Sequence, residues 1–169
     1  LDVRRLFREM LQALSFLHSH DVLHRDCKPD NILMSASGSF VLADFGAACD
    51  LSDESVWRYH SICAARYRPP EVFFCCRSYD TPVDIWSLAC CIVEAATGRE
   101  AFPASEDSDV LLAMLRRLGS PPTNFLHRIR AHPKAVKITS KVLPYKMKPS
   151  SYFFRRLRDP LLRSMLLSM

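Results

Sequence analysis

The sequence lacks the features of several protein classes. Its apolar stretches are all shorter than the roughly 20 residues that a membrane-spanning helix needs, which argues against a membrane protein. It has no Cys-x-x-Cys spacing to indicate a zinc site, and no recognisable secretory signal peptide. Its seven cysteines are an odd number with two pairs of direct neighbours, which does not suit a secreted disulfide framework. We therefore expect reduced thiols in an intracellular protein of the cytoplasm, the nucleus or both.

Acidic residues are absent from residues 127–158, which contain ten lysines and arginines and so have a net charge of +10. Residues 1–126 have a net charge of −5, so the overall charge of +5 combines an acidic part of the chain with a strongly basic one. One interpretation makes 127–158 a docking surface for an acidic protein or for nucleic acid, and the other makes it a solvated insertion between two helices. Nucleic acid is the weaker interpretation, because no recognised binding motif accompanies the charge.

The composition suits one globular domain, since 49% of the 169 residues are apolar and 24% are charged. Apolar residues at helical spacing, or on all sides of a segment, predict several helices. The expected helices are 1–20, 82–97, 107–118 and 159–169. The second of these should be buried, with Thr81 as its N-cap and Gly98 ending it, and the last should begin at a capping Asp159.

Two short motifs place chemically active side chains close together. The first is His24-Arg25-Asp26-Cys27-Lys28-Pro29-Asp30-Asn31, and the second is Asp44-Phe45-Gly46. Between them, two apolar runs separated by small residues predict a β-hairpin, whose open ends would bring Asn31 and Asp44 together. Their amide and carboxylate oxygens suit Mg²⁺, Asp26 can accept a proton from a hydroxyl, and Lys28 adds a compact positive charge. These groups are the parts needed to transfer a phosphoryl group from ATP.

Both motifs resemble those of the eukaryotic protein kinase family. Downstream, Arg68-Pro69-Pro70-Glu71 is similar to the Ala-Pro-Glu motif that closes the kinase activation segment. Asp84-Ile85-Trp86-Ser87-Leu88-Ala89 is similar to the Asp-x-Trp-Ser-x-Gly motif. The residues before Glu71 and the stretch Leu118-Gly119-Ser120-Pro121-Pro122 resemble the cyclin-dependent, MAP and DYRK-like kinases, a group called CMGC.

The resemblance implies a mainly α-helical fold with a small β-hairpin region, which is the C-terminal lobe of the protein kinase fold. Residues 1–169 would form a partial kinase domain. The N-terminal lobe would be absent, because neither a Gly-x-Gly-x-x-Gly loop nor a Val-Ala-Ile-Lys strand precedes His24. Residues 127–158 would be a basic insert of the CMGC type.

The resemblance also implies an activity, the transfer of a phosphoryl group from Mg-ATP to serine or threonine of protein substrates. Asp26 and Lys28 would be catalytic. Asn31 and Asp44 would bind Mg²⁺ and, together with Lys28, ATP. The remaining motif residues would support this site structurally: His24, Phe45 and Gly46.

Residues outside the two motifs receive regulatory and structural roles from the same resemblance. Tyr59 and Ser61 are candidate phosphorylation sites in the activation loop, and Arg25 could pair with such a phosphate. Asp84 would be a buried carboxylate that holds the backbone of the catalytic loop. Glu71 is expected to lack a partner, because its usual arginine belongs to a motif that this sequence does not reach.

Three residues bear on the substrate of a kinase of this type. Arg68 would favour proline after the phosphorylated residue. Ala64 stands where most active relatives have a threonine or serine that helps to tie the catalytic aspartate to the lysine. Arg66 replaces an aromatic residue that is often found at its position.

Other functions are compatible with parts of the sequence. A non-catalytic, pseudokinase-like scaffold would bind protein partners through the basic segment. A small-molecule phosphotransferase is disfavoured because the motifs around Glu71 and Asp84 belong to a region that handles protein substrates. The 169 residues alone are expected to be inactive without the loop and lysine that hold ATP. The expected partners are protein substrates and a regulatory or docking protein, and no feature indicates an oligomeric state.

Overall fold

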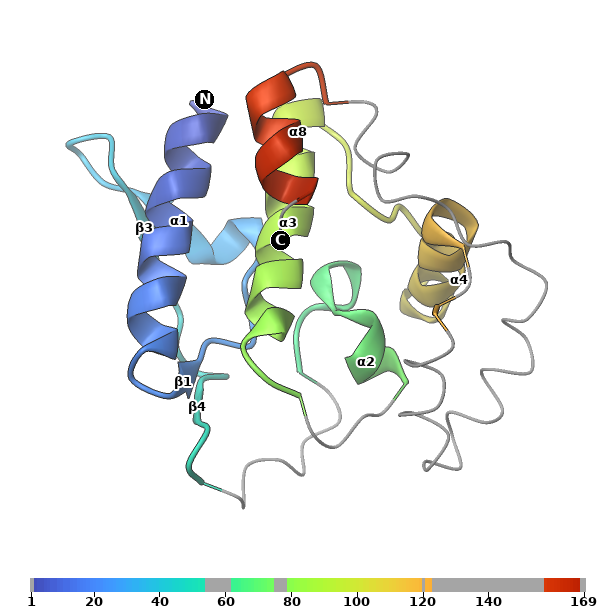
Figure 1. The fold of residues 1–169 in the computed structure, drawn as a ribbon, viewed down its shortest axis with the longest axis horizontal. Coiled ribbons are helices and arrows are strands. Elements are labelled where there is room, and N and C mark those ends of the chain that lie inside the picture. The colour runs from blue at the N-terminus through green and yellow to red at the C-terminus, as the bar shows by residue number, and fades with distance from the viewer. Residues whose placement is uncertain (1, 54–61, 75–78, 120, 123–156, 168–169) are drawn as a thin grey trace.

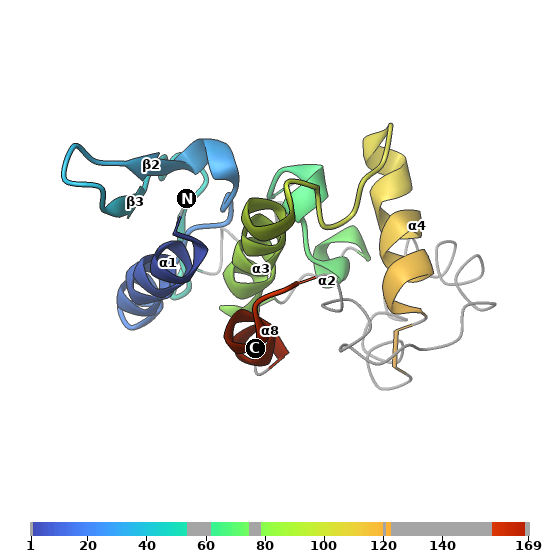
Figure 2. The same ribbon diagram turned by 90° about the horizontal axis from the view of Figure 1, so that it is seen from above.

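The computed structural model describes residues 2–53, 62–74, 79–119, 121–122 and 157–167, so most of the basic stretch 127–158 lies outside the described residues. The described residues are mainly helical (Figure 1). The longer helices are α1 (Val3–His18), α3 (Pro82–Thr97), α4 (Asp107–Leu118) and α8 (Pro160–Leu167). Figure 2 shows α1, α3 and α8 side by side, with the short α2 (Pro70–Phe73) between α3 and α4. The expected helical fold with a small β region is confirmed.

A β-hairpin joins the two chemically active motifs. Its strands β2 (Ile32–Met34) and β3 (Phe40–Leu42) are antiparallel, with Ile32 opposite Leu42. At the open end, the N–H of Ala43 donates to the carbonyl of Asn31 at 2.8 Å. The hairpin prediction is therefore confirmed, and the end of the first motif lies beside the start of the second.

A second small sheet pairs β1 (Val22–Leu23) with β4 (Cys49–Asp50) in antiparallel fashion. It joins the chain before the first motif to the chain after the second. Two 3₁₀ helices complete this region, η1 (Pro29–Asn31) and η3 (Ala65–Tyr67). The segment that contains the two motifs is thus held at both ends by short strands.

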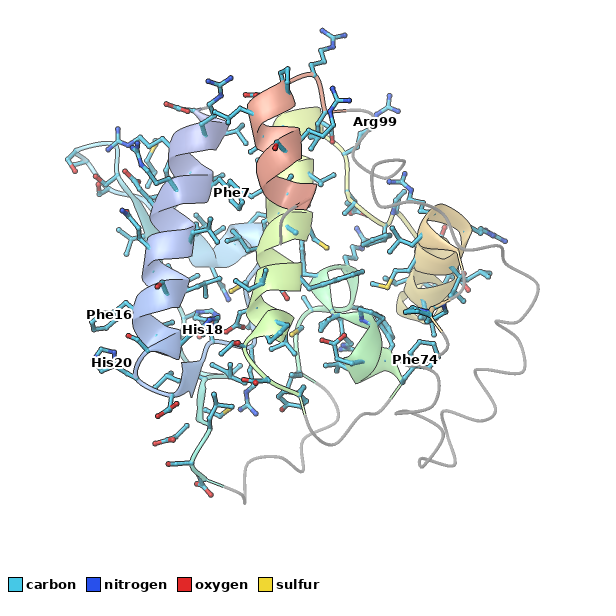
Figure 3. The ribbon with its side chains drawn as sticks, viewed as in Figure 1. Phe7, Phe16, His18, His20, Phe74 and Arg99 are labelled. Carbon is cyan, nitrogen blue, oxygen red and sulfur yellow. The ribbon has the colours of Figure 1, made fainter. Side chains whose placement is uncertain are left out.

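Helix α1 lies within the expected range 1–20, begins at Val3 and is capped by Asp2. The Asp2 carboxylate accepts a hydrogen bond from the N–H of Arg5 at 3.0 Å, which satisfies one of the free amides of the first turn. The apolar face packs against α3 and the hairpin, and Phe7 points from α1 toward α3 (Figure 3). Complete burial of a side chain of this size stabilises a fold by about 1.5–3 kcal/mol.

Helix α3 is the buried centre of the fold, as predicted. Val83 and Ile92 are fully buried, and Gly98 ends the helix in the left-handed conformation with φ of 67°. Thr81 is the N-cap residue of α3, as expected, but its side chain makes no capping hydrogen bond. Thr81 already has helical dihedral angles (φ −43°, ψ −32°), whereas a capping side chain needs an extended backbone to reach the amides of the first turn.

Helix α8 is fastened to α1 by an ion pair. The Asp159 carboxylate accepts hydrogen bonds from the N–H groups of Leu161 and Leu162 at 3.0 and 3.1 Å, so the predicted cap is confirmed. The guanidinium of Arg4 donates to both oxygens of the same carboxylate at 2.6 and 3.0 Å. The buried Leu162 and Leu166 join the main core beneath.

Acid is expected to weaken the attachment of α8. The hydrogen bond from Arg4, followed by that from the Leu162 amide, lowers the pKa of Asp159 below its ordinary value. A carboxyl with a depressed pKa stabilises the fold fully above its unfolded pKa of about 4, and this contribution is lost as pH falls through the folded value. The melting temperature of Asp159→Asn should therefore fall less between pH 5 and pH 2 than that of the unchanged chain. Equal falls would contradict the prediction.

The cysteines within the described part of the chain are free thiols: Cys27, Cys49, Cys63, Cys90 and Cys91. Burial raises the pKa of Cys63 to about 12, so this thiol stays protonated near neutral pH. Cys90 and Cys91 are buried in α3, as the sequence predicts. Among the described helices, none is long and apolar enough to cross a membrane.

Candidate active site

Asp84 anchors the loop that contains the first motif. It lies in the first turn of α3, is completely buried, and accepts hydrogen bonds from the backbone N–H groups of His24 and Arg25, each at 2.8 Å. The Nε2 atom of His18 lies 2.9 Å from the same carboxylate. These contacts give a buried carboxylate the partners that it needs, and they hold the loop from the side of the core.

His24 links the two motifs. Its Nε2 atom lies 3.0 Å from the carbonyl oxygen of Ala43, which can only accept, so the ring proton is on Nε2. The other ring nitrogen, Nδ1, then accepts the N–H of Asp26 at 3.3 Å. The ring also meets Phe45 in a T-shaped contact, with centroids 5.1 Å apart. His24 thus fixes the backbone on both sides of the site.

Arg25 is buried, and its guanidinium is engaged in hydrogen bonds within the protein. Its Nε donates to the carbonyl of Ala47 at 2.6 Å, and its Nη1 donates to the hydroxyl of Tyr79 at 3.2 Å. These bonds hold the chain that follows Gly46. The candidate phosphorylation sites Tyr59 and Ser61 lie outside the described residues.

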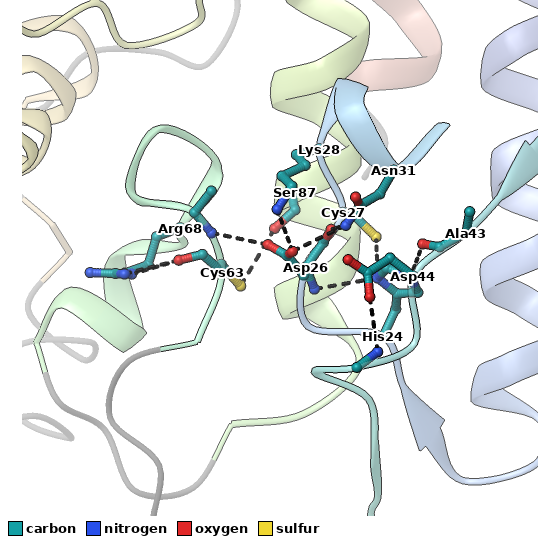
Figure 4. A network of polar contacts seen from close by, with 12 residues as sticks. His24, Asp26, Cys27, Lys28, Asn31, Ala43, Asp44, Cys63, Arg68 and Ser87 are labelled. Carbon is teal, nitrogen blue, oxygen red and sulfur yellow. Dashed lines mark hydrogen bonds and ion pairs between the residues drawn. The ribbon is translucent and has the colours of Figure 1, made fainter. Parts of the chain in front are cut away.

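Asp26 is the centre of a network of donors (Figure 4). Its Oδ2 accepts hydrogen bonds from Nζ of Lys28 at 2.6 Å and from Nδ2 of Asn31 at 3.0 Å. Its Oδ1 accepts one from the backbone N–H of Ala64 at 3.3 Å. The contact with Asp26 raises the pKa of Lys28, so the lysine stays charged. The carboxylate is therefore oriented by groups from both sides of the site.

The amide of Ala64 is a site component that the sequence did not reveal. Ala64 has no side-chain hydroxyl, and its backbone N–H is the group that meets Asp26. The preceding turn is fixed by Arg68, which donates to the carbonyls of Ile62 and Cys63, each at 2.9 Å, and Cys63 has a φ of 61°. No side-chain pattern marks such a group, because any residue except proline supplies the same amide.

Asn31 and Asp44 offer oxygen ligands for a cation. Both protons that Nδ2 of Asn31 can donate go to Asp26, one to its carbonyl and one to its carboxylate, which leaves Oδ1 as the available end of the buried amide. Asp44 is exposed, and within the described part of the chain its carboxylate accepts only the N–H of Gly46, at 3.1 Å. A Cβ at Gly46 would lie 3.1 Å from that carboxylate, so a larger residue would crowd it. One amide and one carboxylate oxygen suit Mg²⁺, which keeps several waters.

The described part of the chain contains no group of three or more His, Cys, Asp or Glu side chains that could hold a metal by themselves. A cation at Asn31 and Asp44 would therefore need further oxygen ligands from water or from a phosphorylated substrate. Mg²⁺ in nucleotide-binding sites is usually coordinated in this way, by one or two protein oxygens together with water and substrate phosphates.

The segment after Ala64 is held by ion pairs and hydrogen bonds to the loop and helix that follow. Arg66 pairs with Glu100, and the hydroxyl of Tyr67 donates to Glu94 at 2.8 Å. The expectation that Glu71 lacks a partner is wrong, since Glu71 takes part in an interaction in the structure.

Comparison with known proteins agrees with this geometry. The protein kinase domain family matches residues 1–150. The chain is 40% identical over 120 residues to the probable serine/threonine-protein kinase glkA of Dictyostelium discoideum, covering 70% of this chain and 25% of that protein. It is 38% identical over 129 residues to the serine/threonine-protein kinase crk1 of Schizosaccharomyces pombe, covering 76% and 38%. It is 36% identical over 140 residues to cyclin-dependent kinase 20 of Rattus norvegicus, covering 82% and 40%.

A solved structure shares the fold. The yeast RNA Pol II CTD kinase CTDK-1 complex contains a chain that superposes with a TM-score of 0.86 at 25% identity, covering 98% of this chain and 54% of that one. The chain thus spans a quarter to two fifths of the length of the curated relatives quoted above. The matched family, these relatives and the shared fold show that the chain belongs to the protein kinase family and is similar to its CMGC members.

Proposed function

We propose that the protein containing this chain is an ATP-dependent protein serine/threonine kinase, and that these residues form the C-terminal lobe of its catalytic domain. The observation that supports this most is the arrangement around Asp26, where Lys28 and Asn31 donate to the same carboxylate oxygen. The free oxygen of Asn31 and the exposed carboxylate of Asp44 lie at the joined ends of the hairpin. The names of two relatives describe the same activity.

In the proposed reaction, Asp26 accepts the proton of a serine or threonine hydroxyl as the hydroxyl oxygen attacks the γ-phosphorus of ATP. The bond that forms joins this oxygen to phosphorus. The bond that breaks joins the γ-phosphorus to the oxygen bridging it to the β-phosphate, so ADP leaves. The donors around Asp26 fix its orientation, and Lys28 compensates negative charge on the transferred group.

Asn31 and Asp44 would hold Mg²⁺, which when bound supplies positive charge to the phosphates. Asn31 is kept ready for this role because its amide nitrogen is engaged with Asp26 and its oxygen is not. Asp44 has a φ of 61°, a conformation that a non-glycine residue adopts at some cost and that is common at functional sites.

A preference for proline after the acceptor has support in the loop beside Asp26. The carbonyl oxygen of Cys63 accepts two hydrogen bonds from the guanidinium of Arg68, at 2.9 and 3.3 Å, so it has no lone pair left to accept an N–H from a bound peptide. Any other residue following the acceptor would bring an N–H that finds no partner there, and an unpaired amide costs about 1–3 kcal/mol. Proline has no N–H and avoids this penalty.

A second candidate function is a non-catalytic scaffold that binds protein partners. It is favoured by Ala64, which offers no hydroxyl beside Asp26 and leaves the backbone amide as the donor. In either case, protein partners are proposed, and the solved relative is itself described as a complex. We also propose an intracellular location, in the cytoplasm or nucleus, which the buried free thiols of Cys27 and Cys63 support.

The 169 residues by themselves are expected to show no useful turnover, because they contain no glycine-rich loop and no Val-Ala-Ile-Lys lysine to hold ATP. Transfer of radiolabelled phosphate to a peptide containing Ser-Pro would be measured for this chain and for the full-length parent protein. The proposal expects activity only in the parent. Turnover by the folded 169-residue chain that disappears in Asp26→Asn would contradict the expected inactivity, and a folded but inactive parent would favour the scaffold.

A further inference from the structure

A surface cavity of about 680 Å³ lies at the opposite end of α3 from Asp84, between the starts of α1 and α8 and the end of α3. This volume falls in the range of about 300–1,000 Å³ that is usual for ligand sites. Its apolar wall contains the buried Leu157 and Leu162, and its rim contains exposed charged side chains. Asp26 and the other residues of the candidate active site do not line it.

The carboxylates at the rim are already engaged. Asp2 caps α1 through the N–H of Arg5, and Asp159 caps α8 and accepts two hydrogen bonds from Arg4. The ion pair offsets the charge of Asp159 and that of Arg4, and the Asp2 carboxylate is held by a backbone amide. The ion pair also fastens the two helix starts to each other, so the cavity is framed by fixed elements.

Two arginines at the cavity remain without a counter-charge. Arg99 and Arg158 both line it, both are exposed, and the guanidinium of neither makes a hydrogen bond or ion pair with the part of the chain that the structure describes. Figure 3 shows Arg99 at the same end of the molecule as the start of α8. The partial negative charge at the end of α3 offsets only part of this charge, since a helix end is equivalent to about half an elementary charge.

Arg158 belongs to the most basic part of the sequence. Leu157 and Arg158 are the last two residues of the basic stretch 127–158, which contains no acidic residue. Arg158, at the end of this basic stretch, therefore lines the cavity together with the other unpaired arginine, Arg99.

We propose that this cavity, together with the end of the basic stretch, is a docking site for an acidic peptide segment of a protein partner. Carboxylates of the segment would pair with Arg99 and Arg158, and a neighbouring apolar side chain would cover Leu157 and Leu162. A peptide fits better than nucleic acid, because the wall formed by Leu157 and Leu162 is apolar and suits a side chain of a peptide rather than a continuous phosphate backbone. The site does not depend on catalysis, so it applies to an active kinase and to a scaffold alike.

The test is the binding of a fluorescein-labelled peptide of glutamates around one leucine, measured by fluorescence anisotropy with the full 169-residue chain. Arg99→Glu and Arg158→Glu should each weaken binding about fivefold, since an exposed ion pair is worth up to about 1 kcal/mol and reversal also adds repulsion. Arg8→Glu is the matched control, because Arg8 is an exposed arginine of α1 that does not line the cavity. Raising the salt from 50 to 300 mM should weaken binding to the unchanged chain.

The melting temperature of each variant is measured first, and Arg99→Gln and Arg158→Gln replace any reversal that unfolds the chain. Absence of measurable peptide binding would overturn the proposal. So would equal losses in all three reversal variants, which would show a diffuse attraction to anions rather than a site. Tighter binding of a single-stranded RNA of equal charge, with the same dependence on Arg99 and Arg158, would also overturn it in favour of nucleic acid.

Discussion

Replacing Asp84 by alanine is expected to destabilise the fold by about 3–5 kcal/mol. The variant would leave the buried N–H groups of His24 and Arg25 without their acceptor, and it would remove the partner of His18. Each unpaired buried group costs free energy of its own, and no water-exposed alternative exists at a position that is completely buried. The free energy of unfolding, measured by urea denaturation of the 169-residue chain, tests this.

A matched control separates the loss of these hydrogen bonds from the loss of a charge. Glu106 is exposed, and its side chain makes no capping bond to α4, so Glu106→Ala should change the stability by only about 0.5 kcal/mol. The loss of stability in Asp84→Asn should lie between those of the two alanine variants. The amide oxygen of the asparagine can still accept from one of the two backbone N–H groups, while its NH₂ group faces the other. A loss in Asp84→Ala no larger than in the control would show that the loop does not depend on this carboxylate.

In the full-length parent protein, Asp26→Asn is expected to lower kcat by about 10²–10⁴-fold, the contribution of a well-placed general base. The asparagine keeps the size of the side chain and can still accept from Lys28, but it cannot take the proton of the attacking hydroxyl. Because Asp26 would act on the acceptor rather than on ATP, the KM for ATP should change little. Steady-state phosphorylation of a Ser-Pro peptide measures both quantities.

Asp21→Asn serves as the control for this variant. Asp21 is an exposed residue of the segment that leads into the catalytic loop, and its φ of 57° is one that asparagine tolerates. The kcat of the Asp21→Asn variant should stay within about twofold of that of the unchanged parent protein. If Asp26→Asn retained comparable activity, the proposed base would be wrong, and the phosphoryl transfer would have to be assigned to another group or another protein.

Much of the fold could be predicted because it depends on periodic burial. The helical spacing of residues in α1 and α4, the apolar run of α3 and the two short runs around residues 35–39 each fix a local structure that any compact arrangement must respect. The motif residues could be singled out for a different reason. Phosphoryl transfer needs particular side chains, and the sequence states directly which residue types are present.

The structural features that the sequence analysis did not anticipate have a common cause. The missing side-chain bond of the Thr81 cap depends on a backbone angle, the engagement of Glu71 on the folded chain, and the role of Ala64 on a main-chain amide that every residue except proline has. None of these is a property of the residue type alone. Each is set by where the chain runs after the core has packed.

The sequence by itself determined the helices, the hairpin and the set of chemically active side chains, because spacing and residue type are enough to specify local burial and proton, metal or charge chemistry. Only the tertiary structure decided which donors orient Asp26, how Asp84 supports the loop beneath it, and which arginines remain unpaired around the cavity at the far end of α3. The bonds from Ala64 to Asp26 and from Asp84 to the loop join residues tens of positions apart, and the packing of the helices is what brings such residues within hydrogen-bonding distance.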